Sequence, residues 1–305
     1  MISARVGKLC VCFAMFFGSV IYAADVEPIE KTGFLPAEST HANWVFSGVV
    51  ANESGEQFAY FFQVQRHENQ FHSIVTLFDA QTKTVILQDE GEASISDPEQ
   101  YNWHVGRSFL RFNAINDSWI FGLKTQDKKG FNFKVDMLNQ PENNPASQNL
   151  RAGMEFIVSQ TGRLNGHIQT GEASTEEFVT AKNTWFRQIW QTNPQSQIHQ
   201  LSCVLCRFND GSGFYSMNMV EPDAVRGAVA GWFDAQGASS AMSQFINVKE
   251  APEGDWHIRI ASPSLHFILS NTIKQHSVVA GFVAENDKQG FCMLSADAMG
   301  EEKTA

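Results

Sequence analysis

The densest group of side chains capable of chemistry lies between Trp185 and Trp190, in the stretch Trp-Phe-Arg-Gln-Ile-Trp. If this stretch is a strand, Trp185 and Arg187 point to one side and Trp190 to the other, because side chains alternate along a strand. An arginine beside a tryptophan can hold a carboxylate or phosphate head group while the indole covers an acyl chain. The alternative, which the sequence favours, is structural: Trp185 lies in a core, Trp190 packs at a domain interface and Arg187 pairs with a neighbouring acid.

Histidines offer acid–base or metal-binding chemistry at three further positions. His167 lies on a predicted strand, where it is either an acid–base group or hydrogen-bond donor, or an ordinary exposed side chain, which is commoner. His257 and His266 lie on neighbouring predicted strands, without the close spacing of a motif such as His-Glu-x-x-His. The sequence therefore predicts no metal site and no cofactor.

Other catalytic patterns are missing from the sequence. It contains no Gly-x-Ser-x-Gly elbow, no P-loop and no dinucleotide-binding glycine pattern. Acids that could act as general acid or base are scattered among strands and turns, at Asp79, Glu155, Asp234 and Glu285. Because no two of them stand out as a pair, the residues alone predict no reaction.

Three cysteines follow the first 24 residues: Cys203, Cys206 and Cys292. They are too few for a disulfide scaffold, so the fold must depend on a hydrophobic core. Cys203-Val-Leu-Cys206 matches a Cys-x-x-Cys motif, but it lies in a predicted strand, where residues three apart face opposite sides. A redox or zinc pair needs both sulfurs on one side, so buried thiols or a disulfide with Cys292 are preferred.

The first 24 residues have the layout of a secretory signal peptide. Basic Arg5 and Lys8 precede an apolar run over residues 9–20, and small residues lie before Asp25. The apolar run is shorter than the roughly 20 residues that span a bilayer, so a cleaved signal is favoured over a membrane helix. Cleavage near Ala23 or Ala24 predicts a periplasmic or secreted protein. No stable membrane anchor is expected. Protein partners are not predicted.

The charge of the chain argues against nucleic acid as a partner. The formal net charge is −11, and the loss of Arg5 and Lys8 with the signal peptide makes it −13. Such a surface repels phosphate backbones, and no stripe of lysine and arginine offsets it.

Hydrophobic alternation with a period of two predicts an all-β fold with little helix. Residues 131–137 alternate apolar and polar side chains, and Phe58, Tyr60, Phe62 and Val64 mark one face of another strand over residues 57–65. Turn signals separate such runs, which favours a barrel or sandwich. The further predicted strands are 44–51, 71–78, 83–88, 107–112, 119–124, 154–160, 163–169, 199–208, 213–221, 224–234, 243–249, 256–261, 265–270, 277–284 and 290–295. Residues 173–180 could hold one helical turn, because Ser174 and Glu177 resemble a capping box.

Two polar stretches interrupt the strands, at residues 139–149 and 191–197. The second is the preferred boundary between two domains. The predicted organisation is a signal peptide (1–24), an N-terminal arm (25–40), a first barrel (41–192), a linker (193–198), a second barrel (199–297) and a tail (298–305). A single closed barrel of 16 or 17 strands is the less favoured alternative, because it would need a wide lumen.

Three groups of stretches carry a resemblance to a known family. They are residues 44–48 (WVFSG) with 55–66, residues 159–166 (SQTGRLNG) with 179–190, and residues 256–267 with 278–283 and 290–294. The first is similar to an opening hairpin with a Trp strand and an aromatic strand that ends in Arg66. The second is similar to a T-G-x-L-x-G strand followed by V-x-G-x-A-W-x-D-x-x-W, and the third to closing strands that end in G-x-G-F-x-E-L. In this order they resemble the lipocalin-like AttH proteins and their relatives, the carotenoid 1,2-hydratases or hydroxyneurosporene synthases.

This resemblance implies two lipocalin-like antiparallel barrels in tandem, with an apolar pocket suited to lipid- or isoprenoid-like molecules. Two departures limit what it implies about activity. Arg187 stands where the family has an acid, and Met293-Leu294 stands where it has Glu-Leu. Hydration of a double bond needs a proton donor, and a guanidinium does not release its proton at a workable pH. The resemblance therefore implies the fold for this chain but does not imply the hydratase chemistry.

The sequence favours a non-catalytic protein that binds a hydrophobic small molecule outside the cytoplasm. The candidate ligand-binding residues are Trp44, Phe62, Arg66, His167, Trp185, Arg187 and Trp190. One alternative is a hydratase- or hydrolase-type enzyme that acts on such a molecule. The other is a secreted interaction protein in which the barrels are only a scaffold, and fold analogy alone cannot decide among the three.

Overall fold

A computed structural model describes residues 39–137, 148–151, 153–171, 175–192, 199–221, 224–244, 246–285 and 288–299. All of them belong to one compact unit, Lys31–Ala305. The predicted signal peptide and linker lie outside the described residues, as does most of the predicted arm and tail. The domain boundaries remain predictions, because the compact unit spans both sheets described below.

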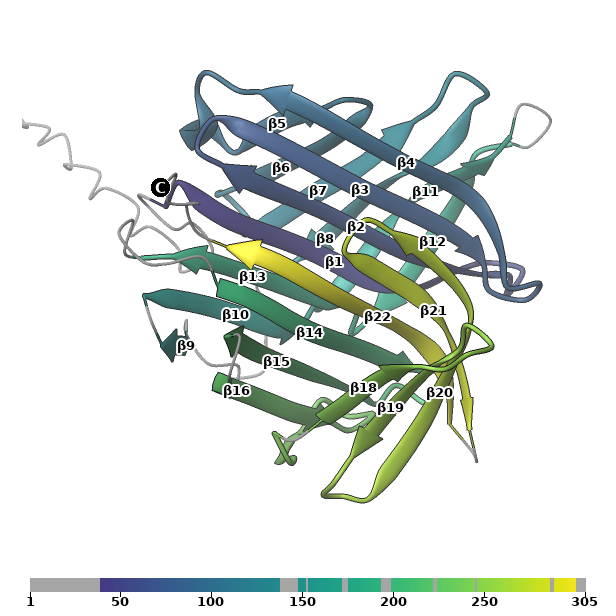
Figure 1. Cartoon of the computed structure of the whole chain (residues 1–305). Helices are drawn as coiled ribbons and strands as arrows, with labels where there is room; N and C mark the ends of the chain where they lie inside the picture. Colours follow the sequence, from purple (N-terminus) through teal and green to yellow (C-terminus); the bar gives the residue numbers. More distant parts are fainter. Residues whose placement is uncertain are drawn as a thin grey trace, which may run out of the picture. The chain divides into compact units, whose positions relative to one another are not determined.

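The all-β fold class is confirmed. The described residues form two curled antiparallel sheets, a near-barrel and a half-barrel (Figure 1). They include a single 3-10 turn, η1 (Pro98–Gln100), and no helix of theirs is long and apolar enough to cross a membrane. The strands therefore do not form one closed barrel.

The first sheet contains the strands from the N-terminal part of the chain. They are β1 (His41–Asn52), β2 (Gln57–His67), β3 (Gln70–Asp79), β4 (Thr84–Ser94), β5 (Asn102–Val105), β6 (Ser108–Asn113), β7 (Ser118–Lys124), β8 (Lys129–Asp136), β9 (Gln148–Arg151), β10 (Met154–Gln160), β11 (Arg163–Thr170), β12 (Glu177–Lys182) and β13 (Trp185–Gln191). Their order is β4-β3-β2-β1-β12-β11-β8-β7-β6-β5, and a branch of β13, β10 and β9 begins where β13 pairs with β1.

The branch occurs along β1, which changes its partner. Residues 42–47 pair with β13, and Ala51 and Asn52 pair with β12. Gly48 lies between these two segments, and a Cβ atom there would come within 2.8 Å of the side chain of Thr184. The absence of a side chain at Gly48 therefore allows the chain to approach closely where it passes from β12 to β13.

The near-barrel closes where β4 meets β5, along a seam with glycine on both sides. A Cβ on Gly91 would lie 2.7 Å from the carbonyl oxygen of Val105 and 2.9 Å from Cα of Gly106. Close by, Oγ of Ser73 donates a buried hydrogen bond to the same Val105 oxygen at 3.2 Å. Backbone contact therefore brings the ends of the sheet together here.

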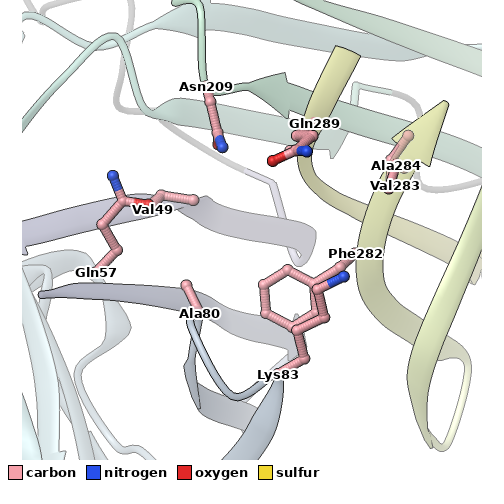
Figure 2. Close-up of a pocket in the computed structure, with 10 residues that line it drawn as sticks. Val49, Gln57, Ala80, Lys83, Asn209, Phe282, Val283, Ala284 and Gln289 are labelled. Atoms are coloured by element: carbon pink, nitrogen blue, oxygen red, sulfur yellow. The ribbon is translucent and has the colours of Figure 1, made fainter. Parts of the chain in front are cut away.

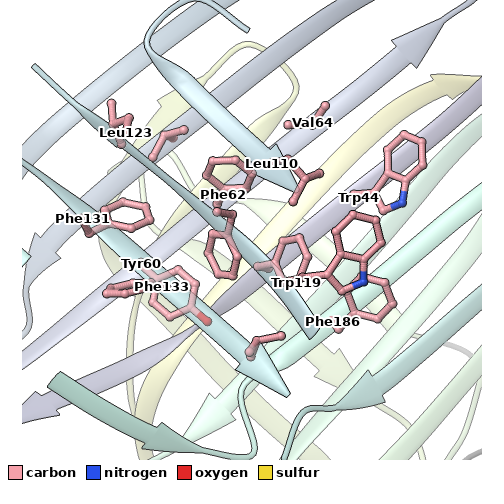
Figure 3. Close-up of a cluster of buried hydrophobic side chains, with 14 of the residues drawn as sticks. Trp44, Tyr60, Phe62, Val64, Leu110, Trp119, Leu123, Phe131, Phe133 and Phe186 are labelled. Carbon is pink, nitrogen blue, oxygen red and sulfur yellow. The ribbon is translucent and has the colours of Figure 1, made fainter. Parts of the chain in front are cut away.

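Aromatic side chains fill the interior of the near-barrel (Figure 3). Trp44 lies 4.7 Å from Trp103 between ring centroids, and Phe46 stacks on Phe121 at 4.2 Å. Phe62, in the same cluster, is fully buried. Each such ring buries on the order of 150–250 Å² on folding, so this cluster is a major source of stability.

The second sheet contains the strands from the C-terminal part of the chain. They are β14 (His199–Phe208), β15 (Gly213–Glu221), β16 (Ala224–Phe233), β17 (Ser239–Ala241), β18 (Ile246–Glu250), β19 (Trp256–Ile260), β20 (Leu265–Gln275), β21 (Val278–Glu285) and β22 (Lys288–Met299). Their order is β17-β16-β15-β14-β22-β21-β20-β19-β18, so β17 and β18 form opposite edges of the half-barrel.

The cysteines of the second sheet occupy both of its faces. Cys203 packs in the cluster between the two sheets, and Cys206 packs on the opposite face, as the strand alternation predicted. Cys206 and Cys292 are register partners on β14 and β22 and form a disulfide. Of the two preferred alternatives, the disulfide with Cys292 is the one observed, and Cys203 is buried outside it.

The two sheets pack face to face through an apolar layer, with β1 beside β22 and β14 (Figure 1). We call this layer the inter-sheet core. The first sheet contributes residues including Val45, Phe61, Ile74, Phe78, Trp185 and Ile189, and the second contributes residues including Leu201, Leu205, Met217, Phe282 and Met293.

The predicted helical turn at residues 173–180 is wrong. Residues 177–180 belong to strand β12, which pairs with β11, and residues 172–174 lie outside the described residues. Val179 is fully buried in the near-barrel, so tertiary packing overrides the capping pattern of Ser174 and Glu177.

Candidate binding site between the two sheets

The stretch from Trp185 to Trp190 forms strand β13, which lies between β1 and β10. Trp185 packs in the inter-sheet core, whereas Trp190 packs in the near-barrel. This is the alternation that the sequence predicted. Strand β13 therefore contributes side chains both to the near-barrel and to the contact with the second sheet.

Trp185 packs between the two sheets, and its indole nitrogen has a hydrogen-bond partner there. Its indole Nε1 donates a hydrogen bond to the carbonyl oxygen of Cys206 at 2.9 Å. Its ring lies 5.6 Å from Phe233 and 6.1 Å from Tyr215 between centroids. Burial raises the pKa of the Tyr215 phenol above its ordinary value, which is consistent with the dry surroundings.

Arg187 is fully buried and bridges the two sheets. Its Nη2 donates to Oδ1 of Asn43 on β1 at 3.1 Å, and its Nη1 donates to Oγ of Ser295 on β22 at 3.0 Å. The planar guanidinium suits this arrangement, because its donors point outward in a fixed fork. Arg187 therefore links β13 to strands of both sheets by hydrogen bonds.

The remaining sequence-predicted site residues lie elsewhere. Trp44 and Phe62 pack with Trp190 in the near-barrel core. Arg66 donates from Nε to the carbonyl oxygen of Glu68 at 2.8 Å and pairs with Glu99 at 3.4 Å. His167 is exposed, with its ring 5.4 Å from that of Phe178. The structure thus brings Trp185 and Arg187 together and separates Arg66 and His167 from them, and the roles of all seven in ligand binding stay predictions.

A cleft opens at the edge of the inter-sheet core, lined by residues of both sheets (Figure 2). Its volume is about 90 Å³. The apolar lining residues are Val49, Ala80, Phe282, Val283 and Ala284, and the polar ones are Gln57, Lys83, Asn209 and Gln289. We call it the inter-sheet cleft.

Aromatic rings lie behind the inter-sheet cleft. Phe282, which lines it, is 5.6 Å from both Phe78 and Phe291 between ring centroids. Phe78 and Phe291 are themselves 5.4 Å apart, so one ring from the first sheet packs against two from the second. Phe282 therefore connects the lining of the cleft to a buried aromatic cluster.

A hydrogen-bonded turn forms one side of the cleft. The backbone nitrogen of Asn209 donates to the carbonyl oxygen of Gln289 at 2.7 Å, which joins two lining residues. Next in sequence, Asp210 forms an ion pair with Lys288 and accepts a hydrogen bond from Oγ of Ser212 at 2.6 Å. Burial raises the pKa of Asp210, but the hydrogen bonds from Lys288 and Ser212 outweigh burial and lower the pKa to about 2.

Two larger hollows of about 330 Å³ are lined mainly by polar side chains. The hollow on β18 and β19 includes His257, whose Nδ1 lies 2.9 Å from Nε2 of His266. The other lies at the ends of β2 and β3 and includes Glu56, Asp79 and Glu177. The second is also lined by Phe58, which belongs to the near-barrel core.

The sequence did not identify the lining of the inter-sheet cleft. Asn209 of the turn signal at 209–211 and the last two residues of the apolar stretch 278–283 line it, but nothing in either segment marks a shared site. Lys83 lies in the turn between β3 and β4 with a φ of 56°, and only the packing of the two sheets brings it toward Phe282. None of the seven candidate ligand-binding residues named from the sequence lines this cleft.

Comparison with known proteins gives a fold relationship. No family model matches the sequence, and no curated protein sequence matches it. A protein from Nitrosomonas europaea assigned as an AttH has a similar structure, with a TM-score of 0.60 and 12% identity over 89% of this chain and 98% of that chain. This chain shares the fold of AttH-like proteins.

A second solved structure extends the fold relationship. Kievitone hydratase from Nectria haematococca has a TM-score of 0.54 and 11% identity over 87% of this chain and 95% of its own. The resemblance to AttH-like and hydratase-type lipocalin-fold proteins is thus confirmed for the fold. At these identities the likeness extends to the fold alone, and Arg187 still marks a departure from the family motif.

Proposed function

We propose that this chain binds an apolar small molecule whose end enters the inter-sheet cleft. The observation that carries the proposal is a cleft with a polar border and an apolar wall, in which the lining residue Phe282 packs against the buried rings of Phe78 and Phe291. Ligand sites are mainly apolar with a few polar groups that fix orientation. The inter-sheet cleft has this composition.

The size of the cleft limits how the ligand binds. Sites for drug-sized molecules measure roughly 300–1,000 Å³. A cleft of about 90 Å³ accepts one ring or the end of a chain, with the rest of the molecule along the polar border. Lys83 and the amides of Gln57, Asn209 and Gln289 would then favour a ligand with an acidic or hydroxyl group.

The fold relationship supports a small molecule as the ligand class. One structural neighbour is named as a hydratase of kievitone, so this fold accommodates proteins that act on small molecules. In this chain the proposal is for binding, because Arg187 replaces the acid of the family motif and donates hydrogen bonds to Asn43 and Ser295. A lipid- or isoprenoid-like molecule is the proposed ligand.

We also propose that the mature protein functions outside the cytoplasm. The signal-peptide pattern of residues 1–24 and the Cys206–Cys292 disulfide both support this location, because disulfides form and persist in oxidising compartments. N-terminal sequencing of the exported protein is expected to begin at Ala24 or Asp25. Recovery of the full-length chain in the cytoplasm would contradict this location.

Binding is tested with cis-parinaric acid, an apolar fluorescent probe with one carboxylate. Ala284 lines the cleft and has an exposed side chain, so Ala284→Trp fills the opening with little disturbance of the core. We expect saturable binding to the wild type and at least tenfold weaker binding to this variant. The matched control is Ala114→Trp, at an exposed alanine in the β6–β7 turn, which should bind like the wild type.

Native mass spectrometry of the gently purified protein supplies an independent test. A copurified apolar molecule that is displaced by the probe supports the proposal. Equal probe affinity in the wild type and in Ala284→Trp would refute the cleft as the site. Chemical alteration of a bound molecule would favour the enzyme alternative over binding alone.

A further inference from the structure

Three potential metal ligands that are distant in sequence meet at the surface where the two sheets adjoin. Nε2 of His72 lies 2.6 Å from Oε1 of Glu90, and Nε2 of His276 lies 3.1 Å from the same oxygen. All three ligand atoms lie within 4.8 Å of one another. The sequence could not indicate this group, because the residues have none of the spacing of a local metal motif.

The three residues come from both sheets. Ile74 packs in the inter-sheet core, and His72 is two residues before it on β3. Because residues two apart share a face of a strand, His72 lies on the face that is turned toward the second sheet. Glu90 on β4 is the register partner of Ile74 and shares that face. His276 lies in the turn between β20 and β21 of the second sheet, with a φ of 48°.

The residue before His276 anchors that turn to the near-barrel. Gln275 is buried, and its Nε2 donates to the carbonyl oxygen of Asp89 at 3.0 Å. Its Oε1 accepts a hydrogen bond from Oγ1 of Thr76 at 3.2 Å. Because Asp89 precedes Glu90 and Thr76 lies on the strand of His72, Gln275 fixes His276 relative to both other residues.

We propose that His72, Glu90 and His276 form a binding site for a divalent transition-metal ion of the zinc class. Two imidazoles and one carboxylate are a ligand set that zinc uses, with a fourth position left for water. Hard ions such as Mg²⁺ and Ca²⁺ prefer sites built of oxygen ligands, so the two imidazoles select against them.

The geometry needs little adjustment to hold such an ion. Ligand atoms about 2.0–2.1 Å from a tetrahedral zinc ion lie roughly 3.3–3.4 Å from one another. The two pairs given above, at 2.6 Å and 3.1 Å, would have to separate by less than an ångström, and the third pair, between the two imidazoles and within 4.8 Å, would have to reach the same spacing. The side chains of His72, Glu90 and His276 are 23%, 33% and 59% exposed, so they can make this adjustment and leave the fourth position open to solvent.

An ion at this position would join the β20–β21 hairpin to strands β3 and β4. Because His276 belongs to one sheet and the other two ligands to the other, the ion would add a link between the sheets outside the apolar core. This site is distinct from the inter-sheet cleft, since no residue of the cluster lines the cleft. The two proposals can therefore fail independently.

The test is calorimetric titration of the chelator-treated full-length mature protein with Zn²⁺ alone. We expect one ion per chain, and loss of about a hundredfold or more in affinity for His276→Gln or Glu90→Gln. In Gln275→Ala all three ligands remain but the turn loses its anchor, so a drop of about tenfold is expected, as for other residues that position ligands. Co²⁺ should give the visible absorption of a four-coordinate site in the wild type and lose it in His276→Gln.

His104→Gln is the matched control, because His104 is an exposed strand histidine outside the cluster. The Zn²⁺ affinity of this variant should equal that of the wild type. Circular dichroism checks that each variant is folded, and His276→Gln is expected to fold because its side chain is largely exposed. Binding of several ions, or binding that persists unchanged in His276→Gln, would show scattered surface histidines and overturn the proposal. Absence of Zn²⁺ binding at millimolar concentration would also overturn it.

Discussion

The guanidinium of Arg187 on β13 donates a hydrogen bond to the hydroxyl of Ser295 on β22, at 3.0 Å, inside the contact between the two sheets. The same guanidinium donates a second hydrogen bond, to Oδ1 of Asn43 on β1. In the family that the sequence resembles, an acid occupies this position of the motif. Here the position has a structural role in joining the sheets.

Replacement of Arg187 by methionine should therefore destabilise the protein. The change leaves Asn43 Oδ1 and Ser295 Oγ buried without this donor, so we expect the free energy of unfolding to fall by about 2–4 kcal/mol. Urea unfolding measures the difference. Arg111→Met, at an exposed position on β6, should change stability by less than about 0.5 kcal/mol. Equal stability of Arg187→Met and the wild type would show that the bridge contributes nothing.

The disulfide between Cys206 and Cys292 should contribute measurably to stability. It connects residues 86 positions apart, so it restricts the unfolded chain strongly. Reduction, or the double change Cys206→Ala and Cys292→Ala, is expected to lower the free energy of unfolding by about 2–5 kcal/mol. Guanidinium unfolding with and without a reductant measures this loss. Cys203→Ala should keep the response to reductant. With the bond intact, the unreduced, denatured mature protein should titrate with one thiol, and a count of three would disprove the bond.

Alternation along strands allowed much of the fold to be predicted. Phe131, Phe133 and Val135 point inward at every second position, and the structure buries all three in the near-barrel. The short strands β5, β9 and β17 were missed, because three or four residues carry too little pattern of their own. Pairing with β6, β10 and β16 determines them, and pairing is a property of the folded chain.

The candidate sites were less accessible to sequence reasoning. The orientation of Trp185 and Arg187 followed from alternation, but the partners of Arg187 are 144 and 108 residues away. The inter-sheet cleft and the cluster of His72, Glu90 and His276 arise where turns of one sheet meet the other. Such sites depend on how the two sheets pack against each other, and the sequence of a single segment does not predict that packing.

The glycine seam of the near-barrel should not tolerate a side chain. A Cβ on Gly91 would lie 2.7 Å from the carbonyl oxygen of Val105, which is a backbone atom that cannot move aside. Gly91→Ala is expected to cost about 1–3 kcal/mol and to speed amide exchange in β4 and β5. Gly171→Ala is the control, because a Cβ there meets no atom of the described residues within 4 Å. Similar effects at both positions would contradict closure at this seam.

Asp210 should make stability depend on pH in the acid range. Its pKa is about 2 in the folded protein, below the ordinary value near 4, so its ionised form is stabilised by folding. That contribution is fully present above about pH 4 and is lost as the pH falls through about 2. The side chain is 47% exposed, so solvent screening reduces the expected contribution to about 1 kcal/mol.

Asp210→Asn should therefore be less stable than the wild type at pH 7, and this difference should shrink between pH 4 and pH 2. Urea unfolding at several pH values measures both effects. Glu53→Gln, at an exposed acid in the β1–β2 turn, should show no such trend. A difference that stays constant down to pH 2 would mean that Asp210 acts through packing and not through its charge.

Lys83 should select for the head group of the ligand at the inter-sheet cleft. It is a cationic residue in the lining, so Lys83→Gln removes the charge that would attract a carboxylate. We expect this variant to bind cis-parinaric acid about two- to fivefold more weakly, as for a partly exposed ion pair, and to bind the methyl ester of the probe unchanged. Lys128→Gln is a close control, because Lys128 is also a turn lysine with a positive φ, at 58°, and lies outside the cleft. If the acid and the ester lose affinity equally in Lys83→Gln, the lysine supports the shape of the cleft and does not recognise charge.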